Sequence, residues 1–206
     1  MIDFFEVSRI KVVFMDVGGV LLTNGWDHES RQEAAKKFDL DYIDMEAKHN
    51  FIYNVFEIGS ITLDDYLDTV VFDRSRNFSK DDFKKFMFAQ STELPKFLSW
   101  LKNWKRQTQL PVFAVNNESQ ELNDYRIDTF ALHQVFDGFF SSCYMKVRKP
   151  DPRIFEKALE IAHVKAKECV YFDDRQMLVN AAKKVGINSI QHQEFEITKA
   201  ILENFI

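Results

Sequence analysis

The chain has 206 residues, of which 27 are Lys or Arg and 32 are Asp or Glu, so its formal net charge is −5. Hydrophobic residues make up 46% and include 21 Phe. This apolar surface is enough for a sizeable core and excludes an intrinsically disordered chain. The length fits one domain, or a core domain with a small second one. The acidic balance argues against a nucleic-acid partner, because proteins that bind nucleic acids normally carry a basic face.

The cysteine content and the apolar runs indicate the compartment. Cys143 and Cys169 are too few for a disulfide framework, and we expect two buried, reduced thiols. No apolar run approaches the roughly 20 residues of a membrane span, and the N-terminal residues lack the pattern of a secretion signal. The sequence therefore predicts a cytoplasmic protein without a membrane partner. It leaves the oligomeric state open.

Short apolar runs indicate the strands of a sheet, and segments of helical periodicity follow them. The runs lie at residues 10–15, 110–115, 138–141, 169–172 and 188–190. Helical periodicity marks residues 118–132, 152–163, 174–185 and 195–205. Strands that alternate with helices at this pitch predict βαβ units. The predicted fold is therefore α/β, with a Rossmann-like parallel sheet covered on both faces.

A long stretch separates the first two apolar runs, and it has helical periodicity throughout. Helices are expected at residues 27–38, 41–56, 63–72, 80–90 and 94–105. Thr62-x-x-Asp65 and Ser79-x-x-Asp82 have the pattern of capping boxes, so the carboxylate pairs there mark helix starts. We predict a core domain formed by residues 1–22 and 93–206, with residues 23–92 inserted as an all-helical second domain.

Polar side chains follow the ends of the predicted strands. The set consists of Asp16, Asn116, Asn117, Lys149, Asp173 and Asp174. In an open parallel sheet, ligands bind beyond the carboxyl ends of the strands, so we expect these side chains to converge at one edge. Asp173 and Asp174 directly follow an apolar run, and a carboxylate pair at such depth repels itself unless a cation or hydrogen-bond donors neutralise it. Because all the ligands are oxygens, Mg²⁺ is the expected ion.

Four segments in this order carry a resemblance to a known family. They are VVFMDVGGVL at 12–21, VFAVNN at 112–117, RKPDP at 148–152 and VYFDD at 170–174. Together they resemble the haloacid dehalogenase-like hydrolases, and the helical insertion resembles the cap domain of that superfamily. The Asp-x-Gly-Gly-Val and Arg-Lys-Pro-x-x-x-Ile-Phe forms are similar to the branch that contains bacterial glucose-1-phosphate phosphatase-type enzymes.

The resemblance implies a Mg²⁺-dependent hydrolase, a phosphatase of a small phosphorylated metabolite such as a sugar phosphate. Asp16 is then the nucleophile that forms an aspartyl-phosphate, which water hydrolyses. The metal is expected on Asp16, the carbonyl of Gly18 and Asp174, with Asp173 binding the ion or one of its ligands.

Further residues are expected to hold the phosphate. Lys149 would contact both Asp16 and the phosphate and neutralise charge during transfer. Gly18 and Gly19 would let the backbone turn sharply and offer N–H groups to phosphate oxygens. Asn116 and Asn117 complete the predicted phosphate-binding set.

The chain departs from the usual pattern of family phosphatases at two positions. Gly18 stands where these enzymes usually have a second Asp that acts as general acid and base. Asn116 stands where they usually have Ser or Thr. A good leaving group, as in a sugar 1-phosphate, or His28 from the insertion could compensate for the missing acid. Trp26, Tyr53 and Glu57 are further candidates to face the substrate.

Two alternatives stay open at this point. Asp16 could attack carbon in a metal-independent haloacid dehalogenase, although the Asp173-Asp174 pair speaks against it. Gly18 and Asn116 together also allow a catalytically degenerate relative that binds a phosphometabolite or a partner without turnover. In the phosphatase reading, three carboxylates and Lys149 leave a local charge that one Mg²⁺ neutralises, so metal-free protein should bind phosphate poorly.

Overall fold

The computed structural model describes residues 9–205, and within them five parallel strands form one sheet. The strand order is β3-β2-β1-β4-β5. The strands are β1 (Val12–Met15), β2 (Val112–Ala114), β3 (Gly138–Phe139), β4 (Cys169–Asp173) and β5 (Asn188–Gln191). The predicted α/β fold with a parallel sheet is therefore confirmed.

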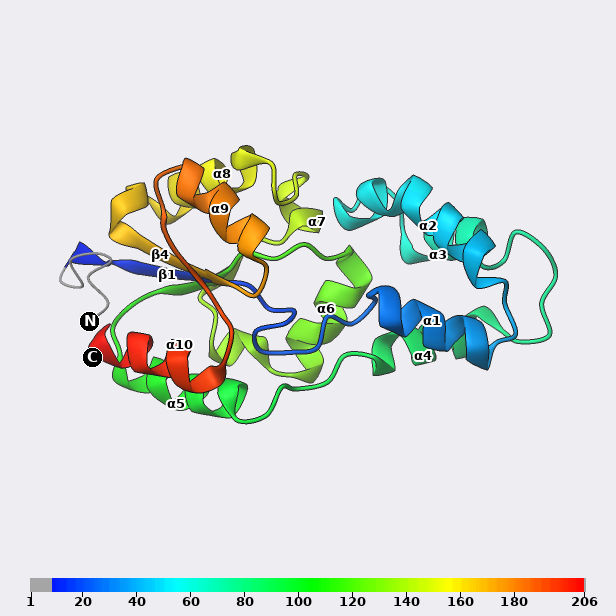
Figure 1. Cartoon of the computed structure of the whole chain (residues 1–206), viewed down its shortest axis with the longest axis horizontal. Coiled ribbons are helices and arrows are strands. Elements are labelled where there is room, and N and C mark those ends of the chain that lie inside the picture. Colours follow the sequence, from blue (N-terminus) through cyan, green and yellow to red (C-terminus); the bar gives the residue numbers. More distant parts are fainter. Residues whose placement is uncertain (1–8, 206) are drawn as a thin grey trace.

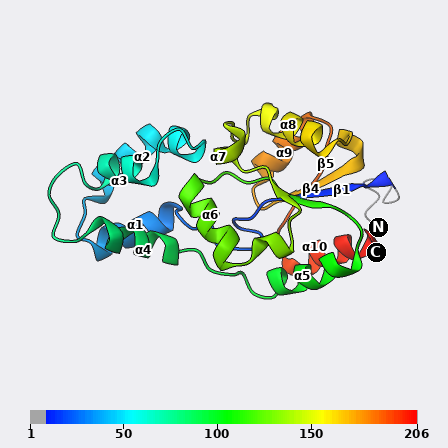
Figure 2. The same cartoon turned by 180° about the vertical axis from the view of Figure 1, so that it is seen from behind.

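Helices cover both faces of the sheet, as Figures 1 and 2 show from opposite sides. On one face lie α8 (Pro152–Ala162) and α9 (Gln176–Lys184), and on the other lie α5 (Phe97–Gln107) and α10 (Phe195–Leu202). Side chains of β1 alternate between the two layers: Val12 and Phe14 pack in the cluster with α8, and Val13 and Met15 in the cluster with α5. A run that is apolar at every position is what a strand buried on both faces requires.

Shorter elements complete the core. They are α6 (Gln120–Thr129), α7 (Ser142–Met145), and the 3₁₀ helices η2 (Leu132–Gln134), η3 (Ala166–Glu168) and η4 (Glu203–Phe205). Strand β3 ends at Phe139, two residues before the end of the run predicted at 138–141. The four-residue α7 that follows was not predicted, because a helix this short has no periodicity to detect. Helices α6 and α9 begin two residues later than predicted. Residues 118 and 174 therefore stand in loops at the sheet edge.

The inserted helices pack around an aromatic cluster of their own. They are α1 (His28–Lys37), α2 (Tyr42–Glu57), α3 (Leu63–Val70) and α4 (Lys80–Ala89), and they lie beside the core in Figure 1. Tyr66 and Phe83 are fully buried in this cluster. Thr62 and Asp65 form the predicted reciprocal capping box, and Ser79 caps α4 by accepting from the Asp82 N–H.

Helix α5 belongs to the layers of the core rather than to this cluster. Its Leu98, Leu101 and Trp104 are buried against the sheet, and Trp104 Nε1 donates to the Leu202 carbonyl of α10 at 3.1 Å. The helical insertion is thus confirmed, while the boundaries predicted at 22/23 and 92/93 stay a prediction.

Two segments connect the insertion to the core side by side. The Thr23 N–H donates to the Thr92 carbonyl at 2.9 Å, and the Leu94 N–H donates to the Leu21 carbonyl at 2.9 Å. The chain therefore leaves and re-enters the core at one place. None of the helices within residues 9–205 has the length and apolar character needed to cross a bilayer. Cys143 and Cys169 are buried and form no disulfide, as expected.

Candidate active site

Three carboxylates meet at the carboxyl ends of the two central strands. Met15 of β1 pairs with Phe172 of β4, so Asp16 and Asp173 follow at the same level of the sheet. Together with Asp174 they offer oxygens that all lie within 4.8 Å of one another. The predicted convergence is therefore present, and it follows directly from the parallel register of β1 and β4.

A buried ammonium joins two of these carboxylates. Lys149 Nζ lies 3.0 Å from Asp16 Oδ2 and 2.7 Å from Asp173 Oδ2, and it donates to the Tyr171 hydroxyl at 2.9 Å. The Tyr171 hydroxyl in turn donates to Asp173. Lys149 is 1% exposed, and such a buried charge is tolerated only because its partners are charged and hydrogen-bonded.

The protonation of the site follows from burial and from these neighbours. Burial raises the pKa of Asp16 to about 7; Lys149 opposes this rise, and the charge of Asp173 adds to it. Burial also tends to raise the pKa of Asp173, but the charge and hydrogen bond of Lys149 lower it by more, so the pKa of Asp173 lies below its ordinary value. Burial and Asp173 raise the pKa of Asp174. Burial thus disfavours the charged forms of Asp16 and Asp174 more than their neighbours favour them, and a bound cation would favour both charged forms.

The surroundings of Asp174 fit a divalent cation. Its Oδ1 is buried and has no hydrogen-bond partner among residues 9–205, although an unpaired carboxylate oxygen is costly to bury. Gly19 lies directly against it: a Cβ at this position would stand 2.3 Å from Asp174 Oδ2, and the backbone has a φ of +71°. Asp16, Asp173 and Asp174 therefore could hold Mg²⁺, which prefers oxygen ligands.

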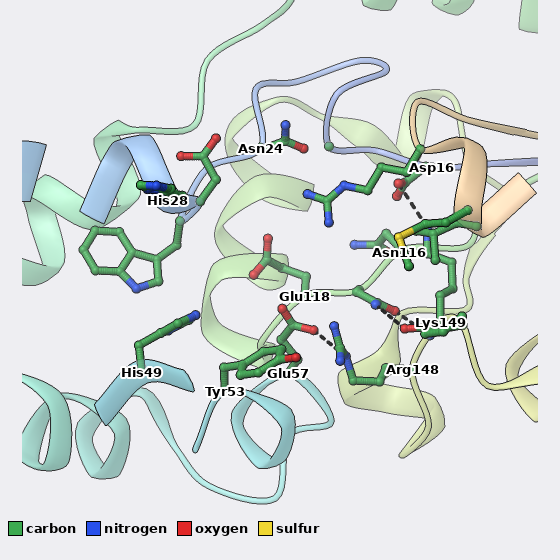
Figure 3. A pocket seen from close by; sticks show the side chains of 18 of the residues that line it. Asp16, Asn24, His28, His49, Tyr53, Glu57, Asn116, Glu118, Arg148 and Lys149 are labelled. Carbon is green, nitrogen blue, oxygen red and sulfur yellow. Dashed lines mark hydrogen bonds and ion pairs between the residues drawn. The ribbon is translucent and has the colours of Figure 1, made fainter. Parts of the chain in front are cut away.

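A cavity of about 490 Å³ opens above these residues, between the core and the inserted helices. Asp16, Gly18, Asn116, Asn117 and Lys149 contribute its floor. The insertion contributes the four residues that the sequence suggested for the substrate side, namely Trp26, His28, Tyr53 and Glu57. Figure 3 shows side chains from both parts pointing into this space.

Comparison with known proteins identifies the family. Residues 10–186 match the family model of the haloacid dehalogenase-like hydrolases. The chain belongs to this family. This match does not identify the specific branch of the family that the Asp-x-Gly-Gly-Val motif suggested.

Individual relatives match this chain at low identity. The hydrolase has a TM-score of 0.76 to a family enzyme from Bacteroides thetaiotaomicron solved with magnesium and inorganic phosphate, at 23% identity over 89% of this chain and 94% of that one. A dehalogenase structure has a TM-score of 0.69 at 15% identity, over 93% of this chain and 96% of that one. Drimenol cyclase drtB of Aspergillus calidoustus is 24% identical over 95% of this chain, which spans only 37% of that protein.

The two glycines after Asp16 have different surroundings in this hydrolase. Gly18 lines the cavity, so its backbone stays a candidate for binding phosphate. The Gly19 N–H donates to the Leu22 carbonyl at 2.8 Å. That N–H is therefore occupied within the turn, and the close approach to Asp174 is the feature that requires glycine at position 19.

The two asparagines at the end of β2 also differ in their partners. Asn116 Nδ2 donates to Asn123 Oδ1 at 3.0 Å, and Asn116 Oδ1 accepts from the Ser141 hydroxyl at 2.7 Å. The Asn123 contact uses one of the two N–H groups of this amide. The Asn117 side chain instead binds the backbone of Lys149, so it positions that residue.

Sequence reasoning missed six charged residues that line the cavity. They are Asp27, Arg31, Glu118, Arg126, Arg148 and Arg175. Arg148 and Arg175 are neighbours of Lys149 and Asp174 in sequence, and this adjacency was the available signal. Nothing local marks Arg126, because its position depends on how α6 is oriented under the connecting segments. Its Nη2 donates to the Thr23 carbonyl at 3.1 Å, and its Nε donates to the Ser91 hydroxyl at 2.9 Å.

Arg148 joins the core to the insertion across the cavity. Its Nε lies 2.7 Å from Glu57 Oε2, its Nη1 donates to Asn54 Oδ1 at 2.7 Å, and its guanidinium lies 4.9 Å from the centre of the Tyr53 ring. All three partners belong to the C-terminal part of α2. This end of α2 is therefore held over the floor of the cavity.

His28 has a partner on its own side of the cavity. Its Nδ1 lies 2.9 Å from the Tyr42 hydroxyl, and the two rings stack with centres 5.8 Å apart. If His28 acted as the acid that Gly18 cannot supply, it would have to give up this contact between α1 and α2.

Proposed function

We propose that this hydrolase is a Mg²⁺-dependent phosphatase that acts on a small phosphorylated metabolite. The single observation that carries the proposal is the cluster of Asp16, Asp173 and Asp174 with the buried Lys149, of which Asp16 and Lys149 line the cavity. A nucleophile, a cation site and a fixed ammonium within hydrogen-bonding reach are the groups that phosphoryl transfer to a carboxylate needs.

Each residue has a physical role in the proposed reaction. Asp16 attacks phosphorus and forms an aspartyl-phosphate, which water then hydrolyses. Lys149 favours the charged form of Asp16 and aligns it, and it offsets charge that develops on the phosphoryl oxygens. Asn116 donates its remaining N–H to one of these oxygens. When bound on the three carboxylates, Mg²⁺ supplies screening between the nucleophile and the phosphate.

The cavity is suited to a small anion. Among the described residues that line it, five are cationic and four are carboxylates. The cations are Arg31, Arg126, Arg148, Lys149 and Arg175, and the carboxylates are Asp16, Asp27, Glu57 and Glu118. The volume of about 490 Å³ lies in the range of pockets for single metabolites. A sugar phosphate of the kind used by glucose-1-phosphate phosphatase-type enzymes is the first substrate to test.

Phosphate release tests the proposal directly. We expect hydrolysis of p-nitrophenyl phosphate with Mg²⁺, loss of release after EDTA, and recovery when Mg²⁺ is restored. Asp16→Asn should abolish release, whereas Asp128→Asn, an exposed carboxylate of α6, should leave it unchanged. Calorimetry should show much weaker binding of inorganic phosphate without Mg²⁺.

The alternatives predict other outcomes of the same experiments. Halide release from a 2-haloacid that persists in EDTA would favour a dehalogenase. Binding of inorganic phosphate without turnover of any phosphate ester would favour a degenerate relative. Release that does not depend on Asp16 would contradict the proposed mechanism.

A further inference from the structure

Glu118 is a buried carboxylate in the cavity without a role in the reaction described above. It stands in the loop between β2 and α6, is 8% exposed, and points into the cavity in Figure 3. Its backbone N–H donates to the Ser142 hydroxyl at 2.9 Å, and its Oε1 accepts from the Ser119 N–H at 3.0 Å. The core loop thus holds this carboxyl group at a set place relative to Asp16.

The carboxyl group lies near the backbone that follows the nucleophile. Arg126 Nη1 is 2.8 Å from Glu118 Oε2 and 3.8 Å from the point where a Cβ on Gly18 would stand. Glu118 is therefore separated from the turn after Asp16 by a single guanidinium group. This turn itself offers no proton donor on a side chain, because residues 17 and 18 are Val and Gly.

Cleavage of an ester of an ordinary alcohol requires a proton for the leaving oxygen. The other candidate groups of the cavity are held by the insertion. Asp27 caps α1 by accepting from the Ser30 N–H. Glu57 is paired with Arg148 as Glu118 is with Arg126, but Glu57 is carried by α2 of the insertion and not by the core loop after β2. His28 Nδ1 lies within hydrogen-bonding distance of the Tyr42 hydroxyl. His49 contacts Tyr66, and burial lowers its pKa to about 4, so it is neutral near pH 7.

The charges that face Glu118 leave both of its protonation states accessible near neutral pH. Burial raises its pKa to about 7; Arg126 opposes this rise, Glu57 across the cavity adds to it, and the Ser119 N–H lowers it. The thiol of Cys143 also lies within its electrostatic influence, and burial keeps that thiol protonated by raising its pKa to about 12. A group of this kind can both give and take a proton.

We propose that Glu118 is the general acid and then the general base of the reaction. As Asp16 bonds to phosphorus, the ester P–O bond breaks, its electron pair stays on the leaving oxygen, and Glu118 gives that oxygen its proton. The Glu118 carboxylate then takes a proton from water as the water oxygen attacks phosphorus. The bond between phosphorus and Asp16 breaks, and Glu118 is protonated again. This inference rests on the proposed phosphatase function.

Two substrates that differ in their leaving group test the role. p-Nitrophenolate leaves without protonation, whereas the alkoxide of glycerol phosphate needs a proton. Glu118→Gln should leave kcat/KM for p-nitrophenyl phosphate within about 3-fold and lower kcat/KM for glycerol phosphate by about 10²–10⁴-fold. Because hydrolysis of the intermediate loses its base, p-nitrophenol should appear in a burst and phosphate should stay on Asp16.

The ratio of the two kcat/KM values does not depend on how much of the variant is folded. Glu57→Gln is the matched variant, since it removes the rival carboxylate of the same cavity, and its ratio should equal that of the wild type. An equal loss on both substrates in Glu118→Gln would mean that Glu118 only holds Arg126, and it would overturn the proposal. A changed ratio in Glu57→Gln alone would transfer the role to Glu57. Absence of turnover by the wild type would overturn this proposal together with the phosphatase function.

Discussion

The side chain of Asn117 binds both backbone polar groups of Lys149. Its Oδ1 accepts from the Lys149 N–H at 2.8 Å, and its Nδ2 donates to the Lys149 carbonyl at 2.8 Å. These two bonds join the loop after β2 to the loop between α7 and α8, and they fix the position of the Lys149 backbone. The ammonium at the far end can then contact Asp16 and Asp173 at the same time.

Removal of this clamp should impair turnover. Asn117→Ala is expected to lower kcat/KM for a phosphate ester by about 10–10²-fold, because a displacement of about 1 Å in a reacting group has effects of this size. Asn117→Asp keeps the acceptor but loses the donor, so its loss should be smaller. Asn77→Ala, at an exposed loop position, is the control and should behave as the wild type. Full activity of Asn117→Ala would contradict the positioning role.

A methyl group at Gly19 should disturb Asp174. Gly19→Ala places a Cβ 2.3 Å from Asp174 Oδ2, in a backbone with a φ of +71°. Gly186→Ala is the matched control: it has a φ of +90°, but its Cβ would meet only Ala166 at 3.6 Å. Both variants should lose roughly 1–2 kcal/mol of stability from the backbone conformation. Only Gly19→Ala should also weaken Mg²⁺ binding, measured by calorimetry, and equal Mg²⁺ affinity in both would refute this reading.

The ion pair of Glu57 and Arg148 should couple the insertion to the core. In a double-mutant cycle of Glu57→Gln and Arg148→Gln, we expect a coupling of about 1 kcal/mol in the free energy of unfolding. Both single variants should raise KM more than they lower kcat, because the pair shapes the cavity and does not touch Asp16. Strictly additive effects on stability would show that the two side chains act independently.

Stability should depend on pH through His49. Burial, with a smaller contribution from Arg31, lowers its pKa from 6.5 to about 4 in the folded chain. Between these values the unfolded chain binds the proton and the folded chain does not, so the free energy of unfolding falls as the pH drops from about 6.5 to 4. The full penalty is about 3 kcal/mol.

Denaturant unfolding across this pH range measures the effect. The raised pKa values of Asp16 and Glu118 have the opposite effect on stability, since in the folded chain these groups hold the proton more tightly than in the unfolded chain. The contribution of His49 is therefore measured as the difference in unfolding free energy between the wild type and His49→Gln. Relative to His49→Gln, the wild type should lose stability toward pH 4. Parallel profiles for the two proteins would contradict the assignment.

The sequence by itself determined the sheet and the place of its carboxylates. Apolar runs mark β1 and β4 because both strands are buried on two faces. Asp16 and Asp173 then meet at one edge, since parallel strands end on the same side of the sheet. Helical periodicity likewise identified the insertion, and α5, which lies outside residues 23–92, packs into the core because its apolar stripe faces the sheet and α10.

Only the tertiary structure decided which side chains surround these carboxylates. The side chain of Asn117 binds the backbone of Lys149, a contact between two loops that pairing of the strands does not dictate. Arg126 reaches the connecting segments because of how α6 is oriented beneath them. Glu118 enters the cavity because α6 begins at Gln120 and leaves it in a loop. These contacts join residues distant in sequence, and their partners are set by packing rather than by local pattern.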